Sequence, residues 1–259
     1  MKAVILAGGF GTRISEESHL RPKPMIEIGK APILWHIMKF YSHYGVNDFV
    51  ICGGYMVHFI KQYFAEYYMR RSDITFDFTN GGSMEIHSNF AEPWRVTVVD
   101  TGLNTQTGGR IKRIKDYVDN ERFFLTYGDG VSDVNLQNLL KKHEENENIV
   151  TLSAVQPGGR FGTLDIDGTT GNVAGFREKV KEDSAWINAG FMVMEPTVFD
   201  YIDGDDTVFE QHPVGKLSAQ GRLGAYLHHG FWHCMDTARD KAFLEDEWKN
   251  GRAKWKLWE

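Results

Sequence analysis

Short apolar segments alternate with helix-like segments over residues 3–155, and this order constrains the fold more than any other feature of the chain. The expected strands are 3–7, 48–52, 74–78, 96–99, 123–127 and 150–155. The helices expected between them are 33–41, 57–69, 111–118 and 136–145. Strands that alternate with helices predict a parallel sheet covered by helices on both faces.

The later part of the chain has a different pattern. We expect strands of a mixed sheet at 161–166, 173–177, 185–194 and 223–228, and helices at 213–219 and 239–248. Residues 79–95 are polar and rich in glycine, which is typical of a loop or hairpin excursion. The chain of 259 residues is therefore expected to form one α/β domain over 1–259. Its sheet would be Rossmann-like, mixed and mostly parallel, with a small additional lobe.

Charge and cysteine content exclude several classes of protein. Lys plus Arg total 29 and Asp plus Glu total 35, so the net charge is -6, which argues against a nucleic-acid partner. The two cysteines, Cys52 and Cys234, are too few for a disulfide framework and favour a reducing compartment. The apolar run at 3–7 is too short for a signal peptide or a membrane span. We therefore expect a cytoplasmic protein with no membrane partner.

A glycine-rich loop follows the first expected strand and reads Gly8-Gly9-Phe10-Gly11-Thr12-Arg13. Ligands in open α/β sheets bind beyond the carboxyl ends of the strands, and glycines there let backbone N–H groups approach a phosphate. The spacing fails the dinucleotide fingerprint, because the last position is Ile14, and no Gly-Lys-Ser/Thr of a P-loop follows. A plain structural turn and a phosphate loop with a fixed arginine remain open.

A lysine bracketed by prolines supports the phosphate loop. In Arg21-Pro22-Lys23-Pro24 each proline fixes its own φ and favours an extended residue before it. We therefore expect Lys23 on a stiff, extended stretch that presents its charge at a fixed point. A solvated basic turn is the alternative.

With these two motifs the chain resembles the sugar-1-phosphate nucleotidyltransferases, whose pattern is Gly-Gly-x-Gly-Thr-Arg followed by Pro-Lys-Pro. The spacer Ser15-Glu16-Glu17 and the block Thr126-Tyr127-Gly128-Asp129-Gly130 are most similar to the glucose-1-phosphate cytidylyltransferases. Two departures are Val180 and Ala189, where the family pattern has proline and glycine. They bear on the choice of sugar more than on the reaction.

The resemblance implies an enzyme that transfers CMP from CTP to α-D-glucose 1-phosphate, giving CDP-glucose and pyrophosphate. It implies a first step toward CDP-linked deoxysugars of surface polysaccharide. It also implies Mg²⁺ as cofactor and a homo-oligomer, with a hexamer as one form. The residues 79–95 and the tryptophans Trp255 and Trp258 are candidate elements for that assembly.

The resemblance also assigns residues to roles. Catalytic residues would be Arg13, Lys23 and Lys179. The nucleotide would be bound by Leu6, Ala7, Gly8, Gly9, Phe10, Gly11, Thr12, Arg13, Lys23, Thr105, Arg110 and Gly128. The sugar phosphate would be bound by Glu178, Lys179 and Asn188, and the metal by Asp129 and Asp236.

Local chemistry leaves alternatives beside these roles. Arginine only donates hydrogen bonds, so Arg110 suits the acceptors of cytosine better than uracil's N3–H, whereas the same segment also reads as a helix start capped by Thr107. The residues His228, His229, His233 and Cys234 suggest zinc, but adjacent histidines on a strand face opposite sides. Alternative functions are a uridylyl-, thymidylyl- or guanylyltransferase for another sugar and a non-catalytic nucleotide-sensing relative.

Overall fold

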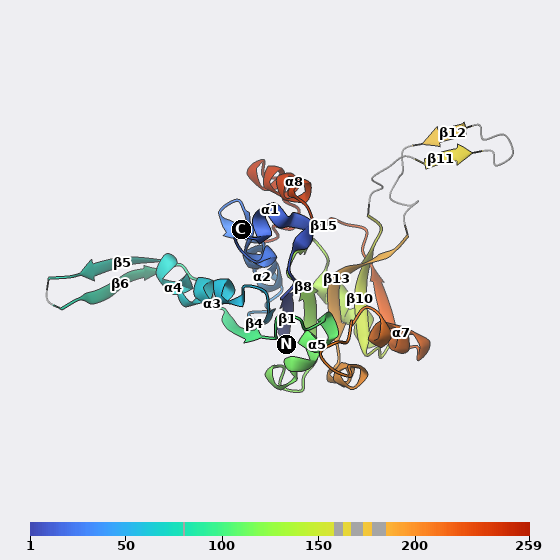
Figure 1. Ribbon diagram of the computed structural model, residues 1–259, viewed down its shortest axis with the longest axis horizontal. Coiled ribbons are helices and arrows are strands. Elements are labelled where there is room, and N and C mark those ends of the chain that lie inside the picture. The colour runs from blue at the N-terminus through green and yellow to red at the C-terminus, as the bar shows by residue number, and fades with distance from the viewer. Residues whose placement is uncertain (80, 158–162, 167–172, 178–184) are drawn as a thin grey trace.

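The structure is a computed structural model that describes residues 1–79, 81–157, 163–166, 173–177 and 185–259. A seven-stranded sheet runs through the body of the molecule (Figure 1). Across the sheet its strands are β14 (Leu223–Leu227), β10 (Val150–Val155), β13 (Ile187–Met194), β8 (Phe123–Tyr127), β1 (Lys2–Ala7), β4 (Asp48–Gly53) and β7 (Arg95–Asp100). Only β13 runs antiparallel to its neighbours, β10 and β8. The expectation of a mixed, mostly parallel sheet is confirmed.

Both faces of this sheet are buried, which explains the unbroken apolar run of the first strand. Ala3 and Ile5 pack into one core cluster, whereas Val4 and Leu6 pack into another on the opposite face. The first cluster is covered by α2 (Ile33–His43) and α8 (Ala238–Lys249). The second is covered by α5 (Thr107–Arg113) and α7 (His212–Ala219).

The helix boundaries agree with the sequence patterns except at two places. The helix expected at 57–69 is divided into α3 (Val57–Ala65) and α4 (Tyr67–Arg70), and the helix expected at 111–118 is α5 followed by a 3₁₀ turn, η3 (Lys115–Tyr117). α6 (Leu136–Glu145) lies where expected, because the side chain of Asn135 caps it by accepting from Asn138 N at 2.9 Å. Gly45 closes α2 with a φ of 79°.

Among the strand pairs of the described residues that lie outside the central sheet, two hairpins correct the expected strand assignment. β5 (Ser72–Asp77) pairs with β6 (Ser83–Asn89) and projects from the body in Figure 1, so the excursion begins at Ser72 rather than at residue 79. β11 (Thr163–Ile166) pairs with β12 (Val173–Arg177) as a separate two-stranded sheet, not as strands of the main one.

Short elements complete the described part of the chain. They are η1 (Thr12–Ile14), α1 (Ser15–Ser18), η2 (Lys23–Met25), β2 (Glu27–Ile28), β3 (Ala31–Pro32), β9 (Gly130–Ser132), η5 (Pro196–Tyr201) and β15 (Trp232–Cys234). None of the helices in the described ranges is long and apolar enough to cross a membrane.

The C-terminal tryptophans do not offer the exposed surface expected of them. Trp255 is 1% exposed, and Trp258 packs edge-on against Trp35 with ring centroids 5.8 Å apart. Both rings therefore cover the α2 face of their own chain, where Trp255 also belongs to the core cluster.

Strand order positions a crevice at β1. The chain passes from β1 to β4 and β7 on one side, and then places β8 on the other side of β1. Connections that leave a parallel sheet in opposite directions open a ligand crevice at the carboxyl ends of the strands. The glycine loop follows β1 at this point.

Candidate active site

A cavity of about 610 Å³ opens at the carboxyl ends of β1 and β8. It is lined by all the residues expected to bind the nucleotide, namely Leu6, Ala7, Gly8, Gly9, Phe10, Gly11, Thr12, Arg13, Lys23, Thr105, Arg110 and Gly128. Asp129 and Asn188 also line it. β13 brings Asn188 to this edge because β13 is antiparallel, so its first residues meet the last residues of β8.

Two glycines of the loop are required by their surroundings. Gly11 has a φ of 66°, a left-handed conformation that side chains disfavour. A Cβ atom on Gly8 would lie 2.1 Å from Nη1 of Arg110, so only glycine lets the loop approach this guanidinium. Close packing against Arg110 therefore requires glycine in this loop, in addition to any requirement set by a ligand.

Arg110 is 5% exposed and holds three segments together. Its Nη1 and Nη2 donate five hydrogen bonds of 2.8–3.2 Å, to the carbonyls of Gly8, Gly53, Gly102 and Leu103 and to the hydroxyl of Thr101. These acceptors lie in the loops after β1 and β7 and at the last residue of β4. Burial lowers the pKa of the guanidinium. A base bound by Arg110 would have to share these donors with the loops.

The segment before α5 differs from the expected capping. The N-cap residue is Gln106 and not Thr107, and no side chain caps this end. Instead Gln106 N donates to Asp205 O and Gly108 N to Thr207 O, each at 2.8 Å. Thr105, expected at the nucleotide, is 9% exposed and lies at the cavity wall.

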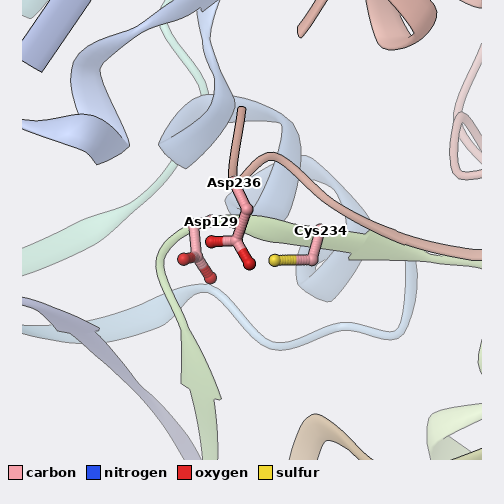
Figure 2. Close-up of side chains that lie close together, drawn as sticks. All are labelled: Asp129, Cys234 and Asp236. Carbon is pink, nitrogen blue, oxygen red and sulfur yellow. The ribbon is translucent and has the colours of Figure 1, made fainter. Parts of the chain in front are cut away.

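Asp129 and Asp236 are brought together by a short ladder that sequence spacing does not reveal. β9 pairs antiparallel with β15 so that Gly130 faces Cys234, and Met235 N donates to Asp129 O at 2.8 Å. The two carboxylates then lie side by side in Figure 2. Their side chains are 26% and 21% exposed, and Asp129 lines the cavity whereas Asp236 lies behind it in contact with the lining residues Arg13 and Lys23.

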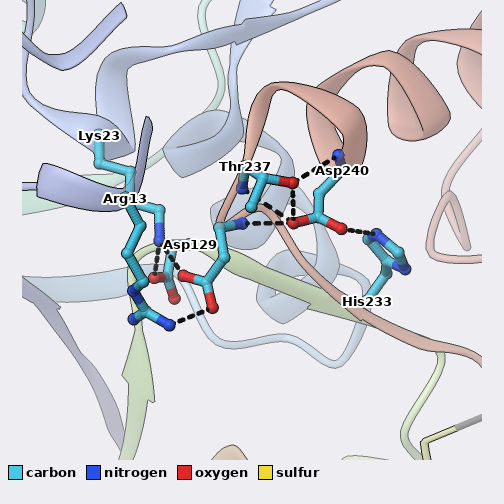
Figure 3. A network of polar contacts seen from close by, with 7 residues as sticks. Arg13, Lys23, Asp129, His233, Thr237 and Asp240 are labelled. Atoms are coloured by element: carbon cyan, nitrogen blue, oxygen red, sulfur yellow. Dashed lines mark hydrogen bonds and ion pairs between the residues drawn. The ribbon is translucent and has the colours of Figure 1, made fainter. Parts of the chain in front are cut away.

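Lys23 is the centre of the charge network in Figure 3. Its Nζ lies 2.6 Å from both Asp129 Oδ2 and Asp236 Oδ1, and Arg13 Nη1 lies 2.6 Å from Asp236 Oδ2. Burial lowers the pKa of Lys23, but Asp129 and Asp236 outweigh it and the net pKa is raised. Burial raises the pKa of Asp236, but Lys23 outweighs it and the net pKa is lowered. Lys23 starts the 3₁₀ turn η2 rather than an extended stretch, and the extended residue is Pro22 with ψ 147°.

The start of α8 fixes the backbone of Asp236. Thr237 Oγ1 accepts from Asp240 N at 3.2 Å, and Asp240 Oδ2 accepts from Thr237 N at 2.8 Å, which together form a capping box. Asp240 Oδ2 also accepts from Asp236 N at 3.1 Å. The helix cap and the carboxylate of the site thus share one anchor.

The residues present fit a hard divalent cation. Ligand atoms of Asp129, Cys234 and Asp236 all lie within 4.8 Å of one another. Mg²⁺ prefers oxygen ligands from one or two carboxylates and takes the rest from water and phosphates. Burial, followed by the two carboxylates, raises the pKa of the Cys234 thiol, so sulfur is the least suitable of the three donors.

The histidines considered for zinc lie in separate contacts. His228 Nε2 is 2.9 Å from Asp133 Oδ1, the ring of His229 meets Trp186, and His233 Nε2 is 3.3 Å from Asp240 Oδ1. Within the described ranges the candidate metal group contains Cys234 but no histidine.

The sugar phosphate residues are only partly described. Glu178, Lys179 and the departure Val180 lie outside the described residues. The second departure, Ala189, is 5% exposed and lines the cavity. Its carbonyl accepts from Trp232 Nε1 at 2.7 Å, so the backbone here is held from β15.

Sequence reasoning missed several residues of the cavity wall. Tyr127 and Trp232 line the cavity, and Glu210 binds the hydroxyl of Tyr127 from outside the lining. Tyr127 ends an apolar strand directly before Gly128-Asp129, and this position was the one signal available for it. Glu210 lies in a polar segment and has no sequence motif.

Comparison with known proteins decides the family. The family model described as nucleotidyl transferase matches residues 2–231 of the chain. The chain belongs to the nucleotidyl transferase family. The matched range includes the glycine loop, Lys23 and Asp129, and it ends five residues before Asp236.

Similarity to individual proteins narrows the assignment of this nucleotidyl transferase. It is 53% identical over 260 residues to a glucose-1-phosphate cytidylyltransferase from Salmonella typhi, which covers the full length of both chains. It is 29% identical to a mannose-1-phosphate guanyltransferase from Yarrowia lipolytica, with 94% of this chain and 62% of that protein covered. The solved structure of HddC from Yersinia pseudotuberculosis shares the fold, with a TM-score of 0.68, 22% identity, and 95% and 99% of the two chains covered. The resemblance expected from the motifs is confirmed.

Proposed function

We propose that this nucleotidyl transferase transfers CMP from CTP to α-D-glucose 1-phosphate. A phosphate oxygen of the sugar attacks the α-phosphorus, the bond from that phosphorus to the bridging oxygen breaks, and pyrophosphate leaves. The supporting observation is full-length identity of 53% to a glucose-1-phosphate cytidylyltransferase, together with the Arg13, Lys23, Asp129 and Asp236 cluster at the cavity.

The proposed residue roles follow from charge and position. This displacement needs no protein nucleophile, so positioning and charge neutralisation supply the catalysis. Arg13, whose side chain is 71% exposed, is free to swing from Asp236 to the triphosphate. Lys23 binds near the α-phosphate, and Lys179, Glu178 and Asn188 bind the sugar phosphate. Asp129 and Asp236 hold Mg²⁺, which neutralises phosphate charge when bound.

Base choice is assigned to the loop wall. Arg110 carries donors that match the acceptors of cytosine and has no acceptor for uracil's N3 proton. Because these donors are already bonded to the carbonyls of Gly8, Gly53 and Gly102, binding of the base would replace some of these bonds and so change the order of the segments they hold. The Thr105 hydroxyl is the second expected contact.

A pyrophosphate-release assay with four nucleoside triphosphates and several sugar 1-phosphates tests the proposal. The expected preferred pair is CTP with glucose 1-phosphate, favoured about a hundredfold or more over UTP, since the wrong base leaves buried groups unpaired. Equal use of UTP or dTTP would refute the cytidylyl assignment and favour the alternative transferases. No turnover with any pair would favour the nucleotide-sensing alternative.

Compartment, pathway and assembly belong to the same proposal. Consumption of CTP fits the cytoplasm, where nucleoside triphosphates are made. The product fits the first step toward CDP-linked deoxysugars. We further propose that the chain is one domain over 1–259 that assembles into a homo-oligomer through the β5–β6 hairpin, without a nucleic-acid or membrane partner.

A further inference from the structure

Tyr127 lies on the wall of the cavity next to Asn188 and takes no part in the expected site. Its ring packs against the backbone of β13 at Gly190. A Cβ atom on Gly190 would lie 2.4 Å from Cδ2 of the ring, and Gly190 has a φ of 83°. Glycine at this position therefore allows the ring to lie in place, and the hydroxyl extends toward Glu210 and Asn188.

The hydroxyl of Tyr127 has a defined direction of hydrogen bonding. It donates a hydrogen bond to Glu210 Oε1 at 2.5 Å and accepts one from Asn188 Nδ2 at 3.4 Å. Asn188 is oriented by Gly190 N, which donates to its Oδ1 at 2.9 Å and so directs the amide nitrogen to the phenol. A phenol is protonated at neutral pH, and with one hydrogen bond donated to Glu210 and one accepted from Asn188 its oxygen has acceptor capacity left.

Glu210 is itself held by the nucleotide wall. Its Oε2 accepts from the hydroxyl of Thr107 at 2.6 Å, and that hydroxyl accepts from Phe209 N at 2.9 Å. These bonds form a chain in which Phe209 N donates to the Thr107 hydroxyl and that hydroxyl donates to Glu210. Tyr127 donates to the other oxygen of the same carboxylate. Because an ionised carboxylate can only accept hydrogen bonds, the phenol has to donate its proton to Glu210. The phenol oxygen is then left to accept a hydrogen bond from another group.

An acceptor beside an amide donor matches a sugar hydroxyl, which both donates and accepts. We propose that the phenol oxygen of Tyr127 accepts a hydrogen bond from one hydroxyl of the sugar 1-phosphate, and that Glu210 is a positioning residue that orients this phenol. The inference rests on the proposed function for the identity of the sugar substrate. It adds a sugar-binding residue on β8 to Asn188 on β13.

The substitution Tyr127→Phe removes the acceptor and keeps the ring. The expected result is a KM for glucose 1-phosphate raised about tenfold or more, with the KM for CTP unchanged, because a hydroxyl loses one partner in a desolvated wall. The matched control is Tyr201→Phe, which removes a hydrogen bond to Gln220 of 2.7 Å outside the cavity lining.

Deoxy analogues identify the contact more sharply. The 2-, 3-, 4- and 6-deoxy forms of glucose 1-phosphate are compared in the wild type and in Tyr127→Phe. One analogue is expected to be a poorer substrate for the wild type and to lose no further efficiency in the variant, because the contact is already absent. A change in packing alone would instead lower the efficiency of all four analogues alike.

The second variant is Glu210→Ala, which removes the carboxylate that orients the phenol. It is expected to raise the KM for glucose 1-phosphate in the same direction as Tyr127→Phe and by a smaller factor, and it answers the question if Tyr127→Phe does not fold. The inference is wrong if the wild type makes CDP-glucose but both folded variants keep the wild-type KM for the sugar, or raise only that for CTP. A wild type that makes no CDP-glucose would refute the proposed function instead.

Discussion

At the scale of single residues, Lys23 decides how the two acidic groups of the site are held. Its side chain is 9% exposed and bonds to both carboxylates, whereas Arg13 bonds to one of them, Asp236. Two cations and two anions therefore meet at the cavity edge with no net charge. A metal ion held by both carboxylates, as proposed, would have to compete with Lys23 for them.

Removal of either carboxylate tests this arrangement. We expect Asp129→Asn and Asp236→Asn each to lower the rate of pyrophosphate release at least ~100-fold, the scale of losing one preorganised charge. Asp116→Asn, at an exposed residue of η3, serves as the control. Full turnover in excess EDTA, or by either site variant, would contradict the metal assignment.

A second residue-scale prediction concerns His36, which is fully buried under the C-terminal tryptophans. Its Nε2 donates to Ile28 O at 2.9 Å and its Nδ1 accepts from Trp255 Nε1 at 3.4 Å, an arrangement that only the neutral ring satisfies. Burial lowers its pKa to about 4. Below pH ~6.5 this histidine takes up a proton in the unfolded chain but not in the folded chain. The free energy of unfolding therefore decreases as the pH is lowered to about 4, by ~3 kcal/mol.

Urea unfolding at pH 7, 5.5 and 4 measures this slope. His36→Gln is expected to be less stable than the wild type at pH 7, because it disturbs both hydrogen bonds. The difference in the free energy of unfolding between wild type and variant is expected to narrow toward pH 4, since the variant has no titrating ring at this position. A gap of constant size across this range would show that His36 does not set the acid sensitivity.

The sequence predicted the charged residues of the site better than the contacts among them. Arg13, Lys23 and Asp129 follow recognisable local motifs, and all three line the cavity. The meeting of Asp129 with Asp236 depends on pairing between β9 and β15, two strands of three residues each, and such short pairs leave no periodic pattern. Glu210 acts through tertiary contacts alone, and no local rule identifies such a residue.

At the scale of elements, the cap of α8 also holds the backbone of Asp236, a residue of the proposed metal site. Thr237→Ala is expected to lower the free energy of unfolding by ~1 kcal/mol, the usual cost of a lost N-cap. Asp240→Ala is expected to lower the rate of pyrophosphate release more than Thr237→Ala does, because Asp240 also holds the backbone of Asp236. Chemical denaturation and pyrophosphate release, measured on both variants, check this difference. Equal losses of activity in the two would count against the link.

The bounds of a helix or strand can be predicted from the sequence where a single local feature sets them. α6 and β10 have the expected bounds because a side-chain cap and a buried apolar run mark them. The sequence pattern predicts the strand β5 correctly but not its partner, because strand propensity does not specify which strand it pairs with. The break between α3 and α4 at Glu66 likewise has no Gly or Pro that would mark it in the sequence.

At the scale of the whole molecule, the β5–β6 hairpin carries exposed apolar side chains. Phe76, Phe78, Met84 and Phe90 are 53%, 83%, 49% and 69% exposed. A lone two-stranded hairpin is marginally stable in water, and exposed aromatic patches usually mark contacts. Light scattering at micromolar concentration is expected to give a multiple of the chain mass, and the double variant Phe76→Ser, Phe78→Ser a smaller one. A wild-type mass of one chain would refute the assembly.

The same hairpin changes how the molecule moves through water. Each strand of six or seven residues reaches ~20 Å at the usual rise per residue, and the arm stands clear of the body in Figure 1. Friction depends on the longest dimension more than on volume, so a single chain should migrate on a gel-filtration column ahead of a sphere of equal mass. Sedimentation velocity should accordingly give a raised frictional ratio, and excision of residues 72–89 should delay elution by more than the lost mass explains.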